Sequence, residues 1–190
     1  MAGLTQAGSD STTLILVRHS LPEVDREKTA AEWRLSEEGR RRCRETAAEL
    51  AVYRPEIVVT SQEPKAQETG EIIAGTLNLP WETAADLHEH RRTGEFFSQE
   101  QFQQQVREFF ERPSELVFGL ETAEQAGQRF STAVSRVVEE HSGKNILIAA
   151  HGTVITLFIA AHNPVEPIAF WQQLKMPDFV VLTQPSFTLL

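Results

Sequence analysis

The sequence has little cysteine and fewer basic than acidic residues. Cys43 is the single cysteine among 190 residues, so the chain cannot form an internal disulfide. This usage is typical of a reducing compartment, and we expect a cytoplasmic protein. Lys and Arg number 18 against 27 Asp and Glu, giving a formal net charge of −9. Such a chain is a poor partner for nucleic acid or an anionic membrane, although a small anionic substrate still fits a locally positive pocket.

Long hydrophobic runs and targeting signals are also missing. The longest apolar runs are far too short to span a bilayer. The opening stretch, MAGLTQAGSDSTT, has neither the basic start nor the apolar core of a signal peptide, and we interpret residues 1–12 as a flexible tail. Hydrophobic residues make up 41% of the chain, which is enough for a full core. We therefore predict a single domain over residues 13–190.

Short apolar runs alternate with amphipathic segments along the chain. The runs at 13–17, 56–60 and 145–150 are typical of buried parallel strands. Helical patterns follow the N-terminal signals Ser36, Pro64, Ser98 with Gln101, and Thr122 with Gln125, and residues 153–162 form an apolar helical run. This alternation predicts an α/β fold, a three-layer α/β/α sandwich around a mostly parallel central sheet.

Two further stretches have weaker patterns. Residues 178–190 predict a last strand or hairpin with an exposed turn near Pro185. Residues 79–97 show no clear periodicity and predict a long loop, a kind of segment that is often functional. We expect substrate specificity to come from residues 21–34 and 79–97, which carry mixed charges together with Phe96 and Phe97.

Each predicted strand ends in residues that suit an anion. The first ends at Arg18 and His19, and the third ends at His151 and Gly152. The second ends at Thr60 and Ser61, with Lys65 in the first turn of the next helix. Ligands of open α/β sheets bind beyond the carboxyl ends of the strands, where helix N-termini also attract anions. The sequence therefore predicts a phosphate site at this edge.

These residue types can also transfer a phosphoryl group. A neutral imidazole is a competent nucleophile near neutral pH. Cations and N–H donors around the three equatorial oxygens supply most of what the transfer needs. A nearby carboxylic acid can protonate the leaving alkoxide, and Glu89 in the 79–97 segment offers one.

Several motifs together resemble those of the histidine phosphatase superfamily, also called the phosphoglycerate mutase-like family. LILVRHS resembles the Arg-His-Gly signature, and IAAHGTVI resembles the second His-Gly motif. Between them lie RLSEEGRRRCRETAAEL, VVTSQEPKAQETGEII, DLHEH and GLETAEQAGQRF, which are similar to the Leu-Thr-x-x-Gly, Ser-x-x-x-Arg-Ala, Leu-Arg-Glu and Gly-Glu-Ser/Thr motifs. The motifs occur in the family's order from about residue 14 to residue 155.

The resemblance implies a phosphoglycerate mutase-like fold and a set of residue roles. His19 would become a phosphohistidine, Arg18 and His151 would bind phosphoryl oxygens, and Glu89 would donate a proton and then activate water. The phosphate-binding set would also include Ser20, Ser61, Lys65, Gly152 and Arg92. The implied activity is a phosphatase that hydrolyses small phosphomonoesters with no metal or other cofactor, and a homodimer is left open.

Two departures from the motifs keep other functions open. Ser20 replaces the family's glycine, and Lys65 replaces its second phosphate-binding arginine, losing the bidentate fork. Arg91 or Arg92 is a candidate to compensate for this loss. One alternative is a catalytically weak protein that binds a phosphate ligand or regulates. Another is a phosphoglycerate mutase-type phosphotransferase, which this compact chain resembles less because mutases carry extra inserted segments.

The remaining polar and aromatic residues receive plainer interpretations. The sequence has no His, Cys and Asp cluster with metal-ligand spacing, so we predict no metal site. His88, His90 and His141 are expected at the surface, with His90 a minor candidate for the pocket. The tryptophans Trp33, Trp81 and Trp171 are expected to serve packing.

Overall fold

The computed structural model describes residues 12–93 and 97–190. The predicted tail, apart from Thr12, and Phe96 lie outside the described residues. A five-stranded sheet with the order β3-β2-β4-β1-β5 forms the centre of the molecule. Its strands are β1 (Thr13–Arg18), β2 (Ile57–Ser61), β3 (Trp81–Ala84), β4 (Ile146–Ala150) and β5 (Asp178–Thr183). The pairs β1–β4, β4–β2 and β2–β3 are parallel, and β5 is antiparallel to β1.

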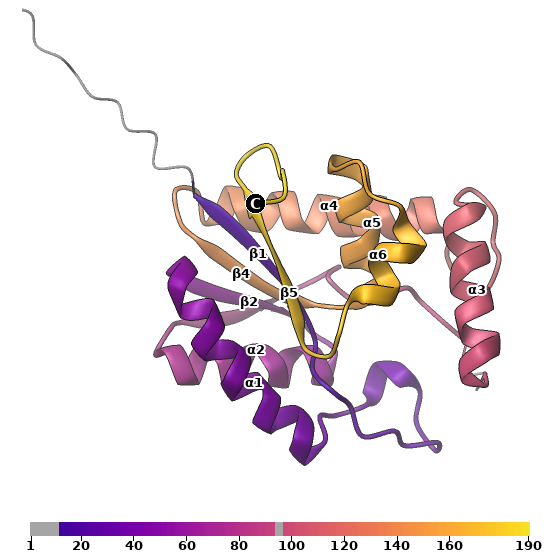
Figure 1. Ribbon diagram of the computed structural model, residues 1–190, viewed down its shortest axis with the longest axis horizontal. Coiled ribbons are helices and arrows are strands. Elements are labelled where there is room, and N and C mark those ends of the chain that lie inside the picture. The colour runs from indigo at the N-terminus through magenta and orange to yellow at the C-terminus, as the bar shows by residue number, and fades with distance from the viewer. Residues whose placement is uncertain (1–11, 94–96) are drawn as a thin grey trace, which may run out of the picture.

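Helices cover both faces of the sheet, which confirms the predicted α/β sandwich (Figure 1). The helices α1 (Glu37–Leu50) and α2 (Pro64–Leu77) pack on one face, and α4 (Ala123–Glu140) and α5 (Gly152–His162) pack on the other. The helices α3 (Gln99–Glu111) and α6 (Pro167–Gln173) lie beyond α5, and the short 3-10 helices η1 (Ala30–Glu32) and η2 (Ala51–Tyr53) complete the elements.

The two core layers follow from the alternation of side chains along each strand. In β1, Leu14 and Leu16 are fully buried against the α4 and α5 side, whereas Ile15 and Val17 are fully buried against α1 and α2. A strand with both faces covered needs apolar residues at every position, which explains the unbroken run before Arg18.

The predicted helix starts are confirmed. Ser36 Oγ accepts a hydrogen bond from the Gly39 N–H, and Ser98 and Thr122 form capping boxes with Gln101 and Gln125. Gly39 has a further role, because a Cβ atom there would lie 2.2 Å from the carbonyl oxygen of Leu21. The absence of a side chain lets α1 press against the chain that leaves β1, which fixes the position of the residues between them.

Two elements differ from the sequence-based expectation. Strand β3 lies within residues 79–97, which were predicted as a loop; it is a mostly exposed edge strand, so it lacks the apolar pattern that marks a strand. Helix α6 was not predicted because its seven residues are too few to show a helical period. In the described part of the chain, no helix is both long enough and apolar enough to cross a membrane.

Candidate active site

A cavity of about 860 Å³ opens beyond the carboxyl ends of β1, β2 and β4. Its polar floor, the name used below for the charged and imidazole groups at its base, consists of Arg18, His19, Glu63, Lys65, Glu89 and Arg92, with the buried His151 directly behind them. The structure thus brings together groups from sequence positions 18 to 151, as the strand-end pattern predicts.

The His19 imidazole is held in one orientation. It is 7% exposed, and its Nδ1 lies 2.8 Å from the carbonyl oxygen of Ser20. A carbonyl can only accept, so Nδ1 carries the proton and Nε2 keeps a free lone pair. Burial, with help from His151 and Lys65, lowers the pKa of His19 well below its ordinary value. The ring is therefore neutral near pH 7, and the lone pair on its Nε2 is free to act as a nucleophile.

His151 lies behind His19 and is fully buried. The two ring centroids are 5.3 Å apart in an edge-to-face arrangement. Ser61 Oγ accepts the Glu63 N–H at 3.3 Å and lies 2.9 Å from His151 Nε2. His151 Nδ1 makes no hydrogen bond within the described residues, and a Glu63 carboxylate oxygen lies 3.8 Å from it. A carboxylate can only accept, so this contact favours a ring proton on Nδ1. Burial and then Lys65 lower the pKa of His151 well below its ordinary value.

Arg18, the last residue of β1, runs along the base of the cavity. Its Nη1 donates to the Leu174 carbonyl at 2.6 Å, and its Nε has no hydrogen-bond partner within residues 12–93 and 97–190. The side chain passes over Gly152, where a Cβ atom would lie 3.0 Å from that Nε. The absence of a side chain at Gly152 therefore leaves room for the Arg18 guanidinium at the floor, and Gly152 itself does not line the cavity.

Lys65 lies inside the site. It is 5% exposed, its Nζ donates to the carbonyl of Ala30 at 2.7 Å, and it forms an ion pair with Glu63. Its charge is near enough to His19 and His151 to lower the pKa of both. The lysine that replaces the motif's arginine is thus a floor cation with an anionic neighbour. Sequence reasoning missed Glu63, since an acid before a helix is ordinary and its neighbours here are remote in sequence.

Glu89 closes the floor from the loop after β3. Arg129 on α4 holds this loop by donating to the carbonyls of Asp86 at 2.8 Å and His88 at 2.9 Å. The Glu89 carboxylate accepts the N–H groups of Thr153 and Val154 at 3.2 and 3.3 Å. The N-terminus of α5, expected to attract phosphate, therefore holds this carboxylate.

The charge of Glu89 follows from its neighbours. Burial alone would raise the pKa of Glu89, but Arg92, followed by His151 and backbone N–H donors, outweighs burial and lowers the pKa to about 2. Arg92 Nη2 lies 3.5 Å from a Glu89 oxygen, and its guanidinium stacks 4.7 Å above the Phe102 ring. Glu89 is therefore ionised in the free site, and Arg92 is a further cation beside it; that Arg92 compensates for the lost arginine stays a prediction.

The two serines assigned to phosphate binding have fully buried side chains and do not line the cavity. Ser20 accepts nothing from the site: its Oγ donates to the Gly39 carbonyl at 2.8 Å and its N–H donates to Thr69 Oγ1 at 3.0 Å. Ser61 bonds His151 instead. In this structure, Ser20 and Ser61 position the histidines, and a direct contact with phosphate stays a prediction.

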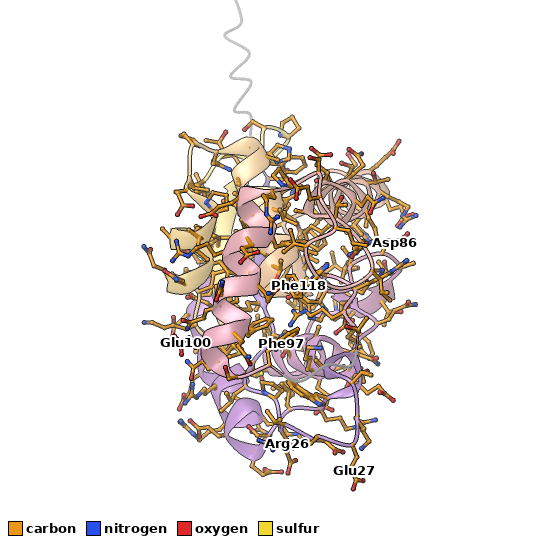
Figure 2. The ribbon with its side chains drawn as sticks, turned by 90° about the vertical axis from the view of Figure 1, so that its right-hand side faces the viewer. Arg26, Glu27, Asp86, Phe97, Glu100 and Phe118 are labelled. Carbon is orange, nitrogen blue, oxygen red and sulfur yellow. The ribbon has the colours of Figure 1, made fainter. Side chains whose placement is uncertain are left out.

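An apolar wall rises from the floor to the mouth of the cavity. It is formed by Val24, Trp33, Phe97, Phe102, Leu120 and Trp171. The Phe102 and Trp171 rings meet at 5.9 Å, joining α3 to α6. In the view onto α3, Phe97 lies between Phe118 and the loop that carries Arg26 and Glu27, while Asp86 lies to one side and Glu100 sits on the helix (Figure 2). The segments 21–34 and 97–102 thus supply much of the wall.

The expected surface position of His90 is wrong, and its minor candidacy for the pocket is confirmed, because it is buried and lines the cavity; the half-buried His88 also lines it. His90 is 3% exposed and its ring packs 4.3 Å from Phe109 and 4.7 Å from Phe118. Its Nε2 donates to the Glu121 carbonyl at 3.1 Å, and burial lowers its pKa. The aromatic partners come from distant segments, so the local sequence carries no sign of this burial.

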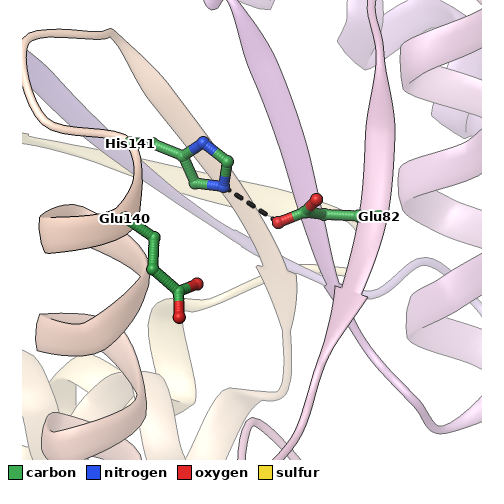
Figure 3. Close-up of side chains that lie close together, drawn as sticks. All are labelled: Glu82, Glu140 and His141. Carbon is green, nitrogen blue, oxygen red and sulfur yellow. Dashed lines mark hydrogen bonds and ion pairs between the residues drawn. The ribbon is translucent and has the colours of Figure 1, made fainter.

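Among the described residues, one group of histidine and acidic side chains is close enough to share a metal ion: Glu82, Glu140 and His141 (Figure 3). Their ligand atoms lie within 4.8 Å of one another, and His141 Nε2 is 2.9 Å from a Glu82 oxygen. Both glutamates are exposed, and none of the three residues lines the cavity. This group is therefore separate from the polar floor.

The chain is similar to known phosphatases in sequence. The model of the histidine phosphatase superfamily (branch 1) matches residues 14–183. The uncharacterized phosphatase PhoE of Bacillus subtilis is 27% identical over 159 residues, which cover 82% of this chain and 80% of that protein.

Solved structures share its fold. YhfR of Bacillus stearothermophilus has a TM-score of 0.73 at 25% identity, covering 95% of both chains. A phosphoserine phosphatase from Entamoeba histolytica has a TM-score of 0.74 at 17% identity over 94% of each chain. A mycobacterial glucosyl-3-phosphoglycerate phosphatase has a TM-score of 0.72 at 17% identity, covering 91% of this chain and 90% of that one. Motifs, fold and family match agree, and the chain belongs to the histidine phosphatase superfamily.

Proposed function

We propose that this protein hydrolyses phosphomonoesters through a phosphohistidine on His19 and needs no metal ion. The observation that carries the proposal is the fixed His19 ring, which is neutral and buried, with Nδ1 bound to the Ser20 carbonyl and Nε2 left as a nucleophile. The cavity above it accommodates a small phosphorylated substrate, with the phosphoryl group on the polar floor and the alcohol against the apolar wall.

The first step transfers the phosphoryl group to the protein. The His19 Nε2 lone pair forms an N–P bond as the ester P–O bond breaks, and the leaving alkoxide takes a proton from Glu89. In the second step Glu89 takes a proton from water, whose oxygen attacks phosphorus as the N–P bond breaks. Inorganic phosphate leaves and neutral His19 is restored.

The polar floor supplies the charge stabilisation that the transfer requires. Arg18 offers an Nε–H without a partner among the described residues, His151 Nδ1 is likewise free of a hydrogen bond there, and Lys65 adds a point charge. Donors fixed in a buried site are worth much more than in water, because they need no reorganisation during the reaction. These groups support the proposed metal-independent route.

The ionised Glu89 must gain a proton before it can act as an acid. An incoming phosphoryl group adds negative charge beside Glu89 and competes for Arg92, and both changes raise the pKa of a carboxyl. The proposed acid is therefore charged in the free protein and protonated when substrate is bound.

The test is to trap the intermediate. Rapid acid-free quenching with a labelled aryl phosphate should leave an acid-labile, base-stable label on His19. His19→Ala should abolish both label and turnover, whereas the control His141→Ala, outside the cavity, should change neither. Turnover by His19→Ala at the wild-type rate contradicts the proposal, as does loss of wild-type activity in chelator that a divalent ion restores.

One observation favours a second candidate, a phosphate-binding protein with weak catalysis. Lys65 is engaged by Glu63 and by the Ala30 carbonyl, so it approaches a phosphoryl group only in competition with those partners. Phosphate binding without hydrolysis of any phosphomonoester, in both wild type and Lys65→Arg, would make this the better description.

A further inference from the structure

The Glu63 carboxylate lies among the donors that the phosphoryl group needs. One oxygen accepts the Glu89 N–H at 2.9 Å. The other pairs with Lys65 Nζ and lies 3.8 Å from His151 Nδ1. A cation and a backbone N–H thus bind this carboxylate at the cavity floor, and an imidazole nitrogen lies close to it. The side chain is 12% exposed and lines the cavity, so a bound phosphoryl group would meet it directly.

We propose that Glu63 determines which ionisation state of the substrate is bound, selecting phosphomonoesters that bring one proton into the site. The inference rests on the proposed function, because it concerns the phosphoryl subsite of that reaction. A monoanionic ester, RO–PO₃H⁻, carries an O–H that can donate to the Glu63 carboxylate. A dianionic ester places two anions side by side, and like charges in a buried site cannot both stay ionised without cost.

The proton count is the same whichever group holds the proton. If the monoanion binds, its O–H donates to Glu63; if the dianion binds, Glu63 takes a proton from solvent and donates to a phosphoryl oxygen. In both cases one proton is shared between Glu63 and the phosphoryl group. The second ionisation of a phosphomonoester has a pKa of about 6. The value of kcat/KM should therefore fall as pH rises above about 6, by up to about tenfold per pH unit.

Of the other groups that face Glu63, the two histidines do not titrate in this pH range, whereas Glu89 takes up a proton of its own when substrate binds in the proposed reaction. The groups that face Glu63 are Lys65 from α2, His151 and His19 from the ends of β4 and β1, Glu89 from the loop after β3, and the nearby cations Arg18 and Arg92. The pKa of His19 and of His151 is held well below the ordinary value, chiefly by burial, and the pKa of Glu89 is about 2. Both imidazoles are thus neutral and Glu89 is ionised above pH 6 in the free protein.

The experiment compares Glu63→Gln with Glu63→Asp and with Glu71→Gln. Glutamine keeps the shape and removes the charge, and aspartate keeps the charge. Glu71 is a control on α2, the helix that begins directly after Glu63, and it bonds Gln67 outside the cavity. Two quantities are measured: kcat and KM for phenyl phosphate from pH 5 to 8, and calorimetric binding of inorganic phosphate at pH 5.5 and 8.

Glu63→Gln should bind inorganic phosphate about tenfold tighter than wild type at pH 8, with little change at pH 5.5. Its KM for phenyl phosphate should rise less steeply above pH 6 than the wild-type KM, because only the proton gained by Glu89 still contributes, while kcat changes less. Glu63→Asp and Glu71→Gln should keep the wild-type profile. A purely structural role for Glu63 would weaken binding at both pH values and spare the shape of the profile.

The outcomes separate this inference from the proposed function. Hydrolysis by Glu63→Gln with the wild-type pH profile overturns the role of Glu63 and leaves the phosphatase. The expected binding change in a protein that never hydrolyses an ester supports the role of Glu63 and removes the phosphatase. Absence of phosphate binding by every variant at both pH values overturns both.

Discussion

The polar floor and the apolar wall of the cavity are built in different ways. Four floor residues stand at the end of β1 or the start of α2, and Glu89 and Arg92 come from the loop after β3. Buried hydrogen bonds hold the histidines of the site, as the Ser20 carbonyl holds His19 and Ser61 holds His151. The wall comes from connecting segments and from α3 and α6, and two of its residues, Val24 and Leu120, are 59% and 64% exposed. Under the proposed function, the fixed floor serves the phosphoryl transfer, whereas the more exposed wall contacts the alcohol part of the substrate.

Removing a hydrogen-bond donor from the floor should have the largest effect on catalysis. Arg18→Ala should lower kcat by roughly a hundredfold, in line with the loss of one preorganised donor to a developing charge. Steady-state kinetics with phenyl phosphate measures it. A matched loss from Arg26→Ala, which lies outside the cavity, would show that general charge and not the floor is responsible.

The buried histidines should make stability depend on pH. The pKa values of His19 and His151 are lowered in the folded state, so below pH 6.5 the unfolded chain binds more protons. The free energy of unfolding should therefore rise with pH between about 5 and 6.5, by up to about 1.4 kcal/mol per pH unit for each histidine.

Denaturant titrations of wild type and His151→Asn measure this slope. In the variant, the slope of the unfolding free energy against pH should be smaller by the contribution of one histidine. An unchanged slope would mean that the fold does not keep His151 neutral. The carboxyl of Glu89, with its pKa lowered from 4.5 to about 2, contributes stability that is lost only below about pH 4.5, outside this window.

Lys65 is the floor cation that forms an ion pair with Glu63. Lys65→Ala should lower kcat/KM by about tenfold and weaken phosphate binding, since a point charge near the phosphoryl oxygens is removed. Lys65→Arg should hold or raise turnover where the longer fork fits beside Arg18. Unchanged rate and phosphate affinity in Lys65→Ala would assign the cation role to Arg92 instead.

The wall should give the smallest and most selective effect. Trp171→Ala should raise KM for naphthyl phosphate by about fivefold through lost apolar contact and leave kcat and the KM for ethyl phosphate nearly unchanged. Trp81→Ala is the control, because Trp81 is 41% exposed on the edge strand and does not line the cavity. Equal effects on both esters would mean that the wall also shapes the floor.

The sequence predicted the parts of the site that depend on local pattern. Arg18, His19 and His151 each follow an unbroken apolar run, and a buried strand that ends in a charge is visible without a structure. The capping signals, which the structure confirms, helped to predict the fold, and the order of the motifs predicted the family. The roles of the floor residues stay predictions until the variants are measured.

The missed features depend on contacts between distant segments. The position of Glu63 matters only because the Glu89 N–H, 26 residues later, and His151 fold against it. His90 is buried by Phe109 and Phe118, and neither lies near it in sequence. Strand β3 has no apolar pattern because an exposed edge needs none. No local property of these residues distinguishes them from surface positions.

The strand order has a consequence for how the protein is made. The first strand in the chain, β1, lies between β4 and β5, whose residues 146–150 and 178–183 leave the ribosome long after it. During synthesis the apolar run of β1 is therefore complete before its sheet partners exist, and His19 is present before His151. Contacts between segments so far apart form slowly, and the exposed run is a site for aggregation or for chaperone binding until β4 emerges.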